Sequence, residues 1–350
     1  MIVAAVLLLL AVAVLLRSNA PPEAARLLPE SDGIVYINLR PIRALLRGRL
    51  QPSPHNPEYQ EFINATGIDW ERDLDQAAIS LHRMSNPNGP NGPVAYSMVL
   101  VGKLTGKRLN TWLAAHAAWR ESYAGRTIYN IPSQGRTVRV AQIGYDMLAI
   151  SNTPTPEQIH SIIDRHNTAA WPFSEPTLLR RYYHEVPLLS LAWGIGQIGL
   201  PFAQDGELKL LGFSLPVAGG STILASVAPT LKIRELLRPH SSLRLKVEEI
   251  ASSSAIAASQ AASLATLVTL VQSAATLPAG NPLDSGLKEL LKSAAVTQQR
   301  DRVIMTATLP VSFLSGLAQS QKSLLAPAPS QGAEAPQSQP GRLPPPGQKR

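Results

Sequence analysis

The first hydrophobic pattern of the chain is an uninterrupted apolar run near its start. Residues 2–16 are all apolar, and Arg17 is the first charged residue. As an α-helix this run would be about 24 Å long, slightly shorter than the ~30 Å hydrocarbon core of a bilayer. We predict a membrane anchor in which the Arg17 side chain extends to the headgroups. The residues assigned to this anchor are Ile2, Val3, Leu7, Leu8, Leu9, Leu10, Val14, Leu15, Leu16 and Arg17.

A cleaved signal peptide is the alternative interpretation of the same run. Residues 18–20 would suit a signal peptidase, but Pro21 and Pro22 follow directly and disfavour cleavage, so we expect an uncleaved anchor. No Lys or Arg precedes the run, and the positive-inside rule alone would keep the domain in the cytoplasm. Because long domains are translocated largely regardless of charge, we expect a single-pass inner-membrane protein whose domain faces the periplasm.

After the anchor, short segments of alternating apolar and polar residues predict strands. They lie near residues 34–39, 76–83, 94–103, 127–131, 137–143, 147–151, 188–193, 207–215, 222–228, 243–247 and 303–309. Residues 86–93 are rich in Asn, Gly and Pro and lie between two of these strands, which predicts a hairpin. Because most strands follow one another closely, the sheet is expected to be mostly antiparallel.

Helical spacing of apolar residues occurs between the groups of strands. Helices are expected near residues 59–63, 105–116, 155–163, 178–185, 254–277, 287–294 and 313–317. Thr105 and Thr155 are the expected N-caps of two of them. Residues 251–283 carry no charge, but their Ala, Ser and Thr content predicts a helix lying on the sheet rather than a second membrane span. The predicted fold class is α+β, with mostly antiparallel sheet, packed helices and an N-terminal transmembrane helix.

The order of these elements is compatible with two similar halves, although no sequence identity establishes a repeat. The expected division is an anchor or signal segment at residues 1–20, a tether at 21–27, one α+β half at 28–168, a second at 169–322, and a tail at 323–350. The tail is rich in Pro, Gln and Ser and lacks the apolar residues needed to form a core. We expect this tail to be disordered.

Composition and charge restrict the possible partners. The chain carries a formal net charge of +8, and its basic residues are densest from Arg17 to Arg49. They can serve solubility, or they can attract anionic lipid headgroups at about 1 kcal/mol for each basic residue. No basic stripe is interleaved with aromatic residues, so no nucleic-acid partner is expected. The absence of cysteine excludes disulfides, thiolate metal sites and a cysteine nucleophile.

Two glycine motifs resemble nucleotide or phosphate sites without meeting their requirements. Residues 194–199 match GxGxxG, but Pro201 and Gly206 follow where a helix would have to bind the pyrophosphate. We expect those glycines to serve a β-bulge or a close approach of strands. Residues 102–108 have one residue too few between their glycines for a phosphate-binding loop, and Arg108 replaces the required Ser or Thr. A plain strand-to-helix loop is expected there.

The histidines do not form a recognisable site. His184 and Glu185 could begin a zinc-protease HExxH motif, but Leu188 occupies the position of the second histidine. His116 lies on a predicted apolar helix face, which favours a semi-buried structural histidine over a metal ligand. No catalytic residue, cofactor-binding residue or metal ligand is therefore predicted, and no cofactor.

A resemblance adds to this interpretation. Residues 28–39 consist of Leu-Pro-Glu-Ser-Asp-Gly followed by the strand-like Ile-Val-Tyr-Ile-Asn-Leu, directly after the anchor. Together with residues 123–129, 147–151 and the helix after Thr155, they resemble uncharacterised exported bacterial proteins with one N-terminal anchor and a duplicated α+β domain. The resemblance covers roughly residues 28–320 and implies a fold but no functional residues.

The expected function is that of a membrane-anchored, non-enzymatic protein of the cell envelope. Its partners would be the lipid bilayer, through the N-terminal helix, and an envelope protein or polymer that the domain binds or scaffolds. A membrane-tethered enzyme of unrecognised class is one alternative, and converged titratable groups with shifted pKa values would favour it. A carrier of a hydrophobic ligand is the other, and an apolar cavity between sheet and helices would favour it.

Overall fold

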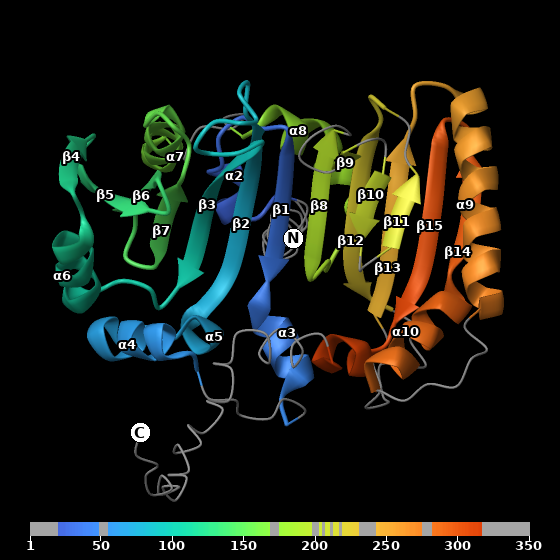
Figure 1. Ribbon diagram of the computed structural model, residues 1–350, viewed down its shortest axis with the longest axis horizontal. Coiled ribbons are helices and arrows are strands. Elements are labelled where there is room, and N and C mark those ends of the chain that lie inside the picture. Colours follow the sequence, from blue (N-terminus) through green and yellow to red (C-terminus); the bar gives the residue numbers. More distant parts are fainter. Residues whose placement is uncertain are drawn as a thin grey trace, which may run out of the picture.

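One large antiparallel sheet with packed helices forms the protein, so the α+β class is confirmed (Figure 1). The computed structural model describes residues 20–48, 55–168, 175–197, 203–204, 207–210, 213–216, 219–230, 243–274 and 282–316. The predicted anchor from Ile2 to Arg17 and the predicted tail lie outside these residues. The sheet has twelve strands in the order β14-β15-β13-β12-β8-β1-β2-β3-β7-β6-β5-β4.

Strands from the first part of the chain form one side of this sheet. They are β1 (Gly33–Asn38), β2 (Leu74–Arg83), β3 (Val94–Gly102), β4 (Trp119–Tyr123), β5 (Arg126–Ser133), β6 (Arg136–Gln142) and β7 (Met147–Ser151). The other side consists of β8 (Ala192–Gln197), β12 (Thr222–Pro229), β13 (Leu243–Ile250), β14 (Ala295–Gln299) and β15 (Arg302–Leu309). A separate three-stranded sheet contains β9 (Ala203–Gln204), β10 (Glu207–Leu210) and β11 (Phe213–Pro216).

The helices occupy the connections between strands. Those of the first part are α2 (Glu23–Arg26), α3 (Leu39–Leu46), α4 (Pro57–Thr66), α5 (Trp70–Asp73), α6 (Lys107–His116) and α7 (Glu157–Asn167). Those of the second part are α8 (Thr177–Tyr182), the 3₁₀ turn η1 (Tyr183–Glu185), α9 (Ser254–Ala274) and α10 (Pro282–Ser293). α9 packs along β14 and β15 near one edge of the large sheet, as the composition of residues 251–283 predicts.

Helices cover both faces of the sheet. Since successive strand residues point to opposite faces, neighbouring residues of one strand belong to different cores. Ala78 and Val99 belong to a core that also contains residues of α2, α7 and α8. Their neighbours Ala77 and Leu100 belong to a second core with residues of α6. The central strands therefore carry apolar residues at consecutive positions, while the edge strands β4 and β14 are mostly exposed.

Several local expectations differ from the structure. Thr105 and Thr155 are not N-caps, because Gly106 and Pro156 occupy those positions and neither makes a side-chain cap. The Thr105 hydroxyl donates a hydrogen bond to the Tyr145 carbonyl instead. The strand expected near 188–193 is shifted and begins at Ala192, and the one expected near 207–215 is divided into β10 and β11. The sequence pattern does not predict β4, because this edge strand is largely exposed and contains charged residues.

α9 also satisfies the length and composition of a membrane-spanning helix. Ser254–Ser273 has a hydropathy of 1.5, and 17% of that segment is buried in the structure. It is the one such helix among the residues described. Ala257 and Leu264 are its buried side chains, and they pack into a core with Leu245 and Val247 of β13.

Candidate functional site

The described part of the glycine motif, residues 194–197, lies inside a central strand. β8 contains Gly194 and Gly196 and pairs with β1 and β12 without any shift of register. A Cβ atom at Gly194 would lie 3.7 Å from the Ile34 carbonyl oxygen, which is an ordinary contact. The expected bulge is therefore absent at both glycines, and the expected close approach is absent at Gly194. No helix begins within this strand to hold a pyrophosphate.

The other sequence motifs form no catalytic or metal site either. Residues 103–106 form the predicted strand-to-helix loop between β3 and α6. His184 lies in η1 and contacts its neighbour Glu185 at 3.4 Å. His116 is exposed and stacks on Trp112 with ring centroids 4.0 Å apart, so the expectation of a semi-buried histidine is wrong. Within the residues described, no cluster of three or more His, Asp or Glu side chains could hold a metal ion.

The arrangement nearest to a catalytic one is a buried ladder of hydroxyl groups beside His82. The His82 Nε2 atom lies 3.2 Å from Ser80 Oγ and 3.1 Å from Ser97 Oγ, and Ser97 Oγ lies 3.1 Å from Ser151 Oγ. Burial lowers the pKa of His82 to about 4, against a smaller opposing effect of Asp32. The three serines are fully buried, so no substrate can reach them. We assign this ladder to the packing of β2, β3 and β7.

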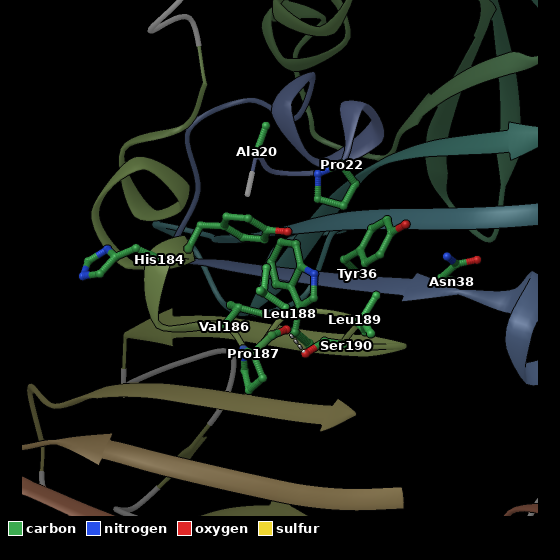
Figure 2. Close-up of a pocket in the computed structure, with 12 residues that line it drawn as sticks. Ala20, Pro22, Tyr36, Asn38, His184, Val186, Pro187, Leu188, Leu189 and Ser190 are labelled. Atoms are coloured by element: carbon green, nitrogen blue, oxygen red, sulfur yellow. Dashed lines mark hydrogen bonds between the residues drawn. The ribbon is translucent and has the colours of Figure 1, made fainter. Parts of the chain in front are cut away.

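A cavity of about 580 Å³ lies at the junction of β1 and β8 (Figure 2). Tyr36 of β1 and Trp193 of β8 line it, and Tyr183 of η1 approaches them. Residues 186–190, which connect η1 to β8, form a second wall, and residues Ala20 and Pro22 form a third. The cavity is therefore bounded by segments that are far apart in the sequence.

Strand register brings the aromatic side chains together. Tyr36 and Trp193 are direct cross-strand partners, and their rings stack with centroids 5.4 Å apart. Tyr183 meets Trp193 edge to face, also with centroids 5.4 Å apart. Such pairs contribute about 0.5–1.5 kcal/mol beyond the burial of their area. The three rings form an apolar part of the cavity wall.

The polar groups of the cavity are suited to binding. Burial and the nearby Tyr183 raise the pKa of Tyr36 to about 12, and burial also raises the pKa of Tyr183. Both phenols stay neutral at physiological pH and can donate hydrogen bonds. The Asn38 Oδ1 atom is buried and has no hydrogen-bond partner among the residues described, so it can accept one from a ligand. No described residue lining the cavity carries a carboxylate, so no acid–base pair is present there.

Two exposed leucines border the cavity. Leu188 and Leu189 are 61% and 66% exposed, and Figure 2 shows them beside the aromatic rings. Leu189 has a backbone φ of 65°, which is unfavourable for a residue other than glycine. The turn is held by the Ser190 hydroxyl, which donates to the Pro187 carbonyl at 2.6 Å. A strained turn that exposes apolar side chains is more typical of a binding site than of a structural connection.

The sequence alone did not identify this site. Tyr36 and Trp193 occupy ordinary strand positions, and no motif links them to Tyr183. The one available signal is the apolar pair Leu188 and Leu189 next to Pro187, which the sequence pattern assigns to a strand. The predicted anchor residues are not described by the structure, but Ala20 in the cavity wall follows Arg17 by only three positions.

Comparisons with known proteins give a distant structural similarity. No protein-family model matches the sequence, and no curated protein sequence matches it. Crystal form I of TP0453 aligns with a TM-score of 0.42 and 10% identity, over 86% of this chain and 98% of that one. Crystal form III gives the same TM-score and identity, over 86% of this chain and 99% of that one. A similarity this distant transfers no function to this protein.

Proposed function

We propose that this protein is a membrane-anchored, non-enzymatic binding module of the cell envelope. The observation that carries the proposal is the aromatic cavity at the β1–β8 junction, whose wall includes Ala20. Apolar clefts with a few well-placed polar groups are the usual form of small-ligand sites. Neutral phenols, an indole and an unpartnered amide oxygen favour recognition of an apolar or aromatic group without chemical conversion.

The cavity wall includes a residue that closely follows the proposed membrane anchor in the sequence. Ala20 lies three residues after Arg17, where the apolar run ends, and three residues of extended chain span at most roughly 11 Å. If residues 2–16 span the bilayer, the cavity opens close to the headgroups. Leu188 and Leu189 would then face the membrane interface, which accounts for apolar side chains that are otherwise exposed to water. The proposal places the domain on the periplasmic side of a single-pass inner-membrane anchor.

The strand order supports the proposed duplication of the domain. Moving outward from the central junction, β1-β2-β3-β7-β6 on one side corresponds to β8-β12-β13-β15-β14 on the other. Short helices, α2 and α8, precede β1 and β8 in the chain. Two halves related in this way would place the cavity between them, at the junction of their first strands. We propose the boundary between these halves at residues 168 and 169, between α7 and α8 along the chain.

Quenching by brominated lipid tests whether the cavity faces the bilayer. The full chain would be placed in phosphatidylcholine vesicles with and without brominated acyl chains, and tryptophan fluorescence would be compared. We expect quenching that decreases in Trp193→Phe and persists in Trp119→Phe, because Trp119 lies on the far edge strand β4. Equal quenching in both variants would contradict the proposed position of the cavity.

The anchor needs its own test, since the cavity position depends on it. We expect the full chain to remain in the membrane fraction after carbonate extraction and to start before residue 20. Protease added to spheroplasts should degrade the domain if it faces the periplasm. A mature protein that begins after Ala20, or a domain protected from protease, would overturn this part of the proposal.

A carrier of a hydrophobic ligand is the second candidate, favoured by the size of the cavity. Its volume of about 580 Å³ lies within the range of small-ligand sites, about 300–1,000 Å³. Mass spectrometry of organic extracts from the purified protein would detect such a ligand. We expect it with the native protein and not with Leu189→Asp, in which a carboxylate enters the cavity wall. If the same lipids accompany both proteins in equal amounts, they reflect the membrane rather than the cavity.

A further inference from the structure

A second cavity, of about 380 Å³, lies between α3, the start of β2 and the end of β3. Its lining contains five basic side chains and two acidic ones. The basic residues are Arg40, Arg43, Arg47, Arg72 and Lys103, and the acidic residues are Asp73 and Asp75. A concave surface dominated by one sign of charge concentrates ions of the opposite sign. We refer to this surface as the basic cleft.

A β-bulge builds one side of the basic cleft. The register of β2 against β3 shifts between Leu74 and Gln76, so Asp75 is an extra residue without a strand partner. Its carboxylate accepts hydrogen bonds from Arg40 at 2.7 Å and from Arg43 at 2.6 Å. Arg43 also donates to the Leu74 carbonyl. Bulges often turn a side chain towards a functional site, and this one fixes two guanidinium groups at the cleft.

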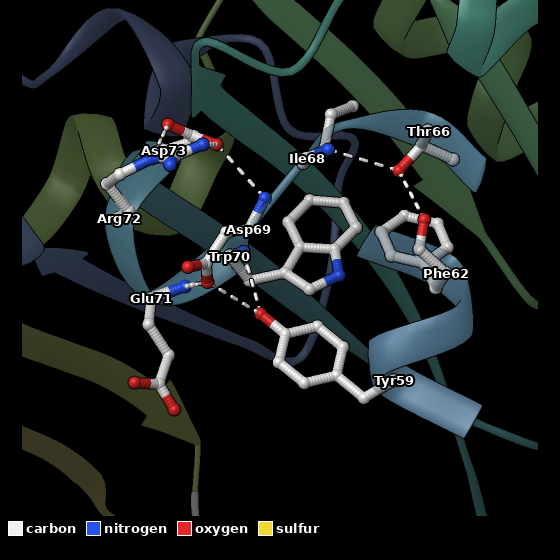
Figure 3. Close-up of polar contacts among 9 residues, drawn as sticks. All are labelled: Tyr59, Phe62, Thr66, Ile68, Asp69, Trp70, Glu71, Arg72 and Asp73. Carbon is white, nitrogen blue, oxygen red and sulfur yellow. Dashed lines mark hydrogen bonds and ion pairs between the residues drawn. The ribbon is translucent and has the colours of Figure 1, made fainter. Parts of the chain in front are cut away.

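A hydrogen-bond network supports the opposite side (Figure 3). Arg72 makes two parallel hydrogen bonds to Asp73, at 2.9 and 2.8 Å. Asp73 also accepts from the Asp69 backbone at 3.0 Å, and Asp69 accepts from the Tyr59 hydroxyl at 3.0 Å. The corner between α4 and α5 therefore holds the Asp73 carboxylate in place.

Both acidic groups are already engaged by arginines. Hydrogen bonding from Arg72 lowers the pKa of Asp73, and hydrogen bonding from Arg40 lowers the pKa of Asp75. Arg47 and Lys103 are exposed, and no ion pair of either is found among the residues described. The cleft therefore retains positive charge that its own carboxylates do not neutralise.

The helix α3 holds two of these arginines on one face, and a third follows directly after its end. Arg40 and Arg43 are three residues apart, which places them on the same side of the helix, and Arg47 is its C-cap residue. Ile42 and Leu45 pack into the core cluster that contains Leu191 and Leu290. Because the apolar side is fixed, the basic side is presented to the cleft in a defined orientation.

We propose that the basic cleft binds the phosphate group of an anionic ligand, either a lipid headgroup or a free phosphate compound. Guanidinium groups match phosphate oxygens in a bidentate geometry, and Arg40 and Arg43 keep further N–H donors beyond those used by Asp75. Arg47 and Lys103 supply positive charge that balances the negative charge of the phosphate. The site goes beyond the aromatic cavity and does not depend on it.

Calorimetric titration of the full chain in phosphatidylcholine nanodiscs with inorganic phosphate tests the site. We expect saturable binding that weakens at least about tenfold in Arg47→Ala/Lys103→Ala, since two charged donors are lost. The matched control is Arg180→Ala/Lys292→Ala, which removes the same charge from two exposed positions elsewhere. Neither pair of residues makes an ion pair in the described structure, so the native protein and both double variants should unfold at similar temperatures.

Two results would overturn the proposal: no saturable phosphate binding by the native protein, or equal weakening in both double variants. Repeating the titration in nanodiscs that contain phosphatidylglycerol distinguishes the sources of the ligand. Weaker phosphate binding there would assign the cleft to a lipid headgroup, and unchanged binding would assign it to a free anion. Quenching of Trp193 by brominated lipid is measured separately, so failure of one proposal leaves the other open to test.

Discussion

Tyr36 and Trp193, 157 positions apart in the numbering, are direct partners across β1 and β8, and their rings stack with centroids 5.4 Å apart. Trp193 is 3% exposed and also contacts Tyr183. The pair therefore joins the two parts of the large sheet and lines the aromatic cavity. A single contact thus contributes to the core and to the candidate site.

Removal of the indole should destabilise the protein strongly. We expect Trp193→Ala to lower the free energy of unfolding by about 3–5 kcal/mol, because the substitution leaves a void between two central strands. Trp119→Ala is the control, since Trp119 is 50% exposed on the edge strand β4. Denaturant titration followed by circular dichroism measures both. Similar losses in the two variants would show that the central stack has no special role.

The buried His82 should make stability depend on pH. Its pKa is about 4 in the folded protein and 6.5 when unperturbed, so the unfolded chain takes up a proton first as the pH falls. The contribution of neutral His82 is present above pH 6.5 and is lost progressively towards pH 4, up to about 3 kcal/mol. Unfolding measured across this range should show a shallower pH dependence in His82→Gln.

His116→Gln is the matched control for that comparison, because His116 is exposed on α6. Its pH profile should follow that of the native protein. Titration of the imidazole by nuclear magnetic resonance gives an independent measurement of His82. A folded-state pKa near 6.5 for His82 would contradict the buried, neutral histidine in the ladder.

Tyr59 should connect α4 and α5 through its hydroxyl group. That hydroxyl donates to Asp69 at 3.0 Å and accepts from the Trp70 backbone at 2.8 Å (Figure 3). We expect Tyr59→Phe to cost about 1–3 kcal/mol, because a partly buried donor loses its partner. Tyr145→Phe should have little effect, since Tyr145 is 87% exposed. Thermal unfolding of both variants checks the difference.

The Tyr59 hydroxyl should ionise at a higher pH than an ordinary tyrosine. Burial, followed by the hydrogen bond to Asp69, raises the pKa of Tyr59 to about 12 from 10. Its contribution to stability is therefore present below pH 10 and is lost as the pH rises towards 12. The difference in ultraviolet absorbance between the native protein and Tyr59→Phe follows this ionisation. A midpoint near pH 10 would mean that the hydroxyl is free in solution.

Arg302 should stabilise the region where β15 pairs with β13, through its ion pairs. It contacts Glu248 at 2.6 Å and Glu185 at 2.9 Å, and the Glu248 side chain is only 3% exposed. Glu248 keeps a second ion pair, with Lys246 at 2.5 Å, and Arg302 is itself 31% exposed, so we expect Arg302→Met to cost about 1–3 kcal/mol, less than the loss of a fully buried pair. Arg244→Met, on the neighbouring strand, is the control because Arg244 is exposed. Denaturant titration at neutral pH measures both.

A fall in pH should weaken the ion pair between Arg302 and Glu185. The hydrogen bond from Arg302 lowers the pKa of Glu185 below its usual 4.5. Its contribution to stability is therefore complete above pH 4.5 and is lost as the pH falls through the folded-state pKa. In Arg302→Met this part of the acid dependence should disappear. An unchanged acid dependence in that variant would mean that other carboxylates account for it.

Local patterns in the sequence determined most of the elements of this protein. Leu243, Leu245 and Val247 alternate with polar residues and form the buried side of β13, as predicted. Ile159, Ile162 and Ile163 have helical spacing and are fully buried in α7, as predicted. The α+β class follows from such patterns, because the periods of strands and helices are local properties. The membrane anchor, which lies outside the described residues, stays a prediction from the sequence.

Only the tertiary structure decided the two candidate sites. The aromatic cavity requires β1 to pair with β8 in one register, and a shift by one residue would turn Tyr36 away from Trp193. The basic cleft requires the bulge at Asp75, which becomes visible only when β2 is aligned with β3. Pairing between distant strands depends on the packing of the whole sheet and leaves no local signal in the sequence. The chain therefore specifies its elements locally, while its sites arise from contacts between elements.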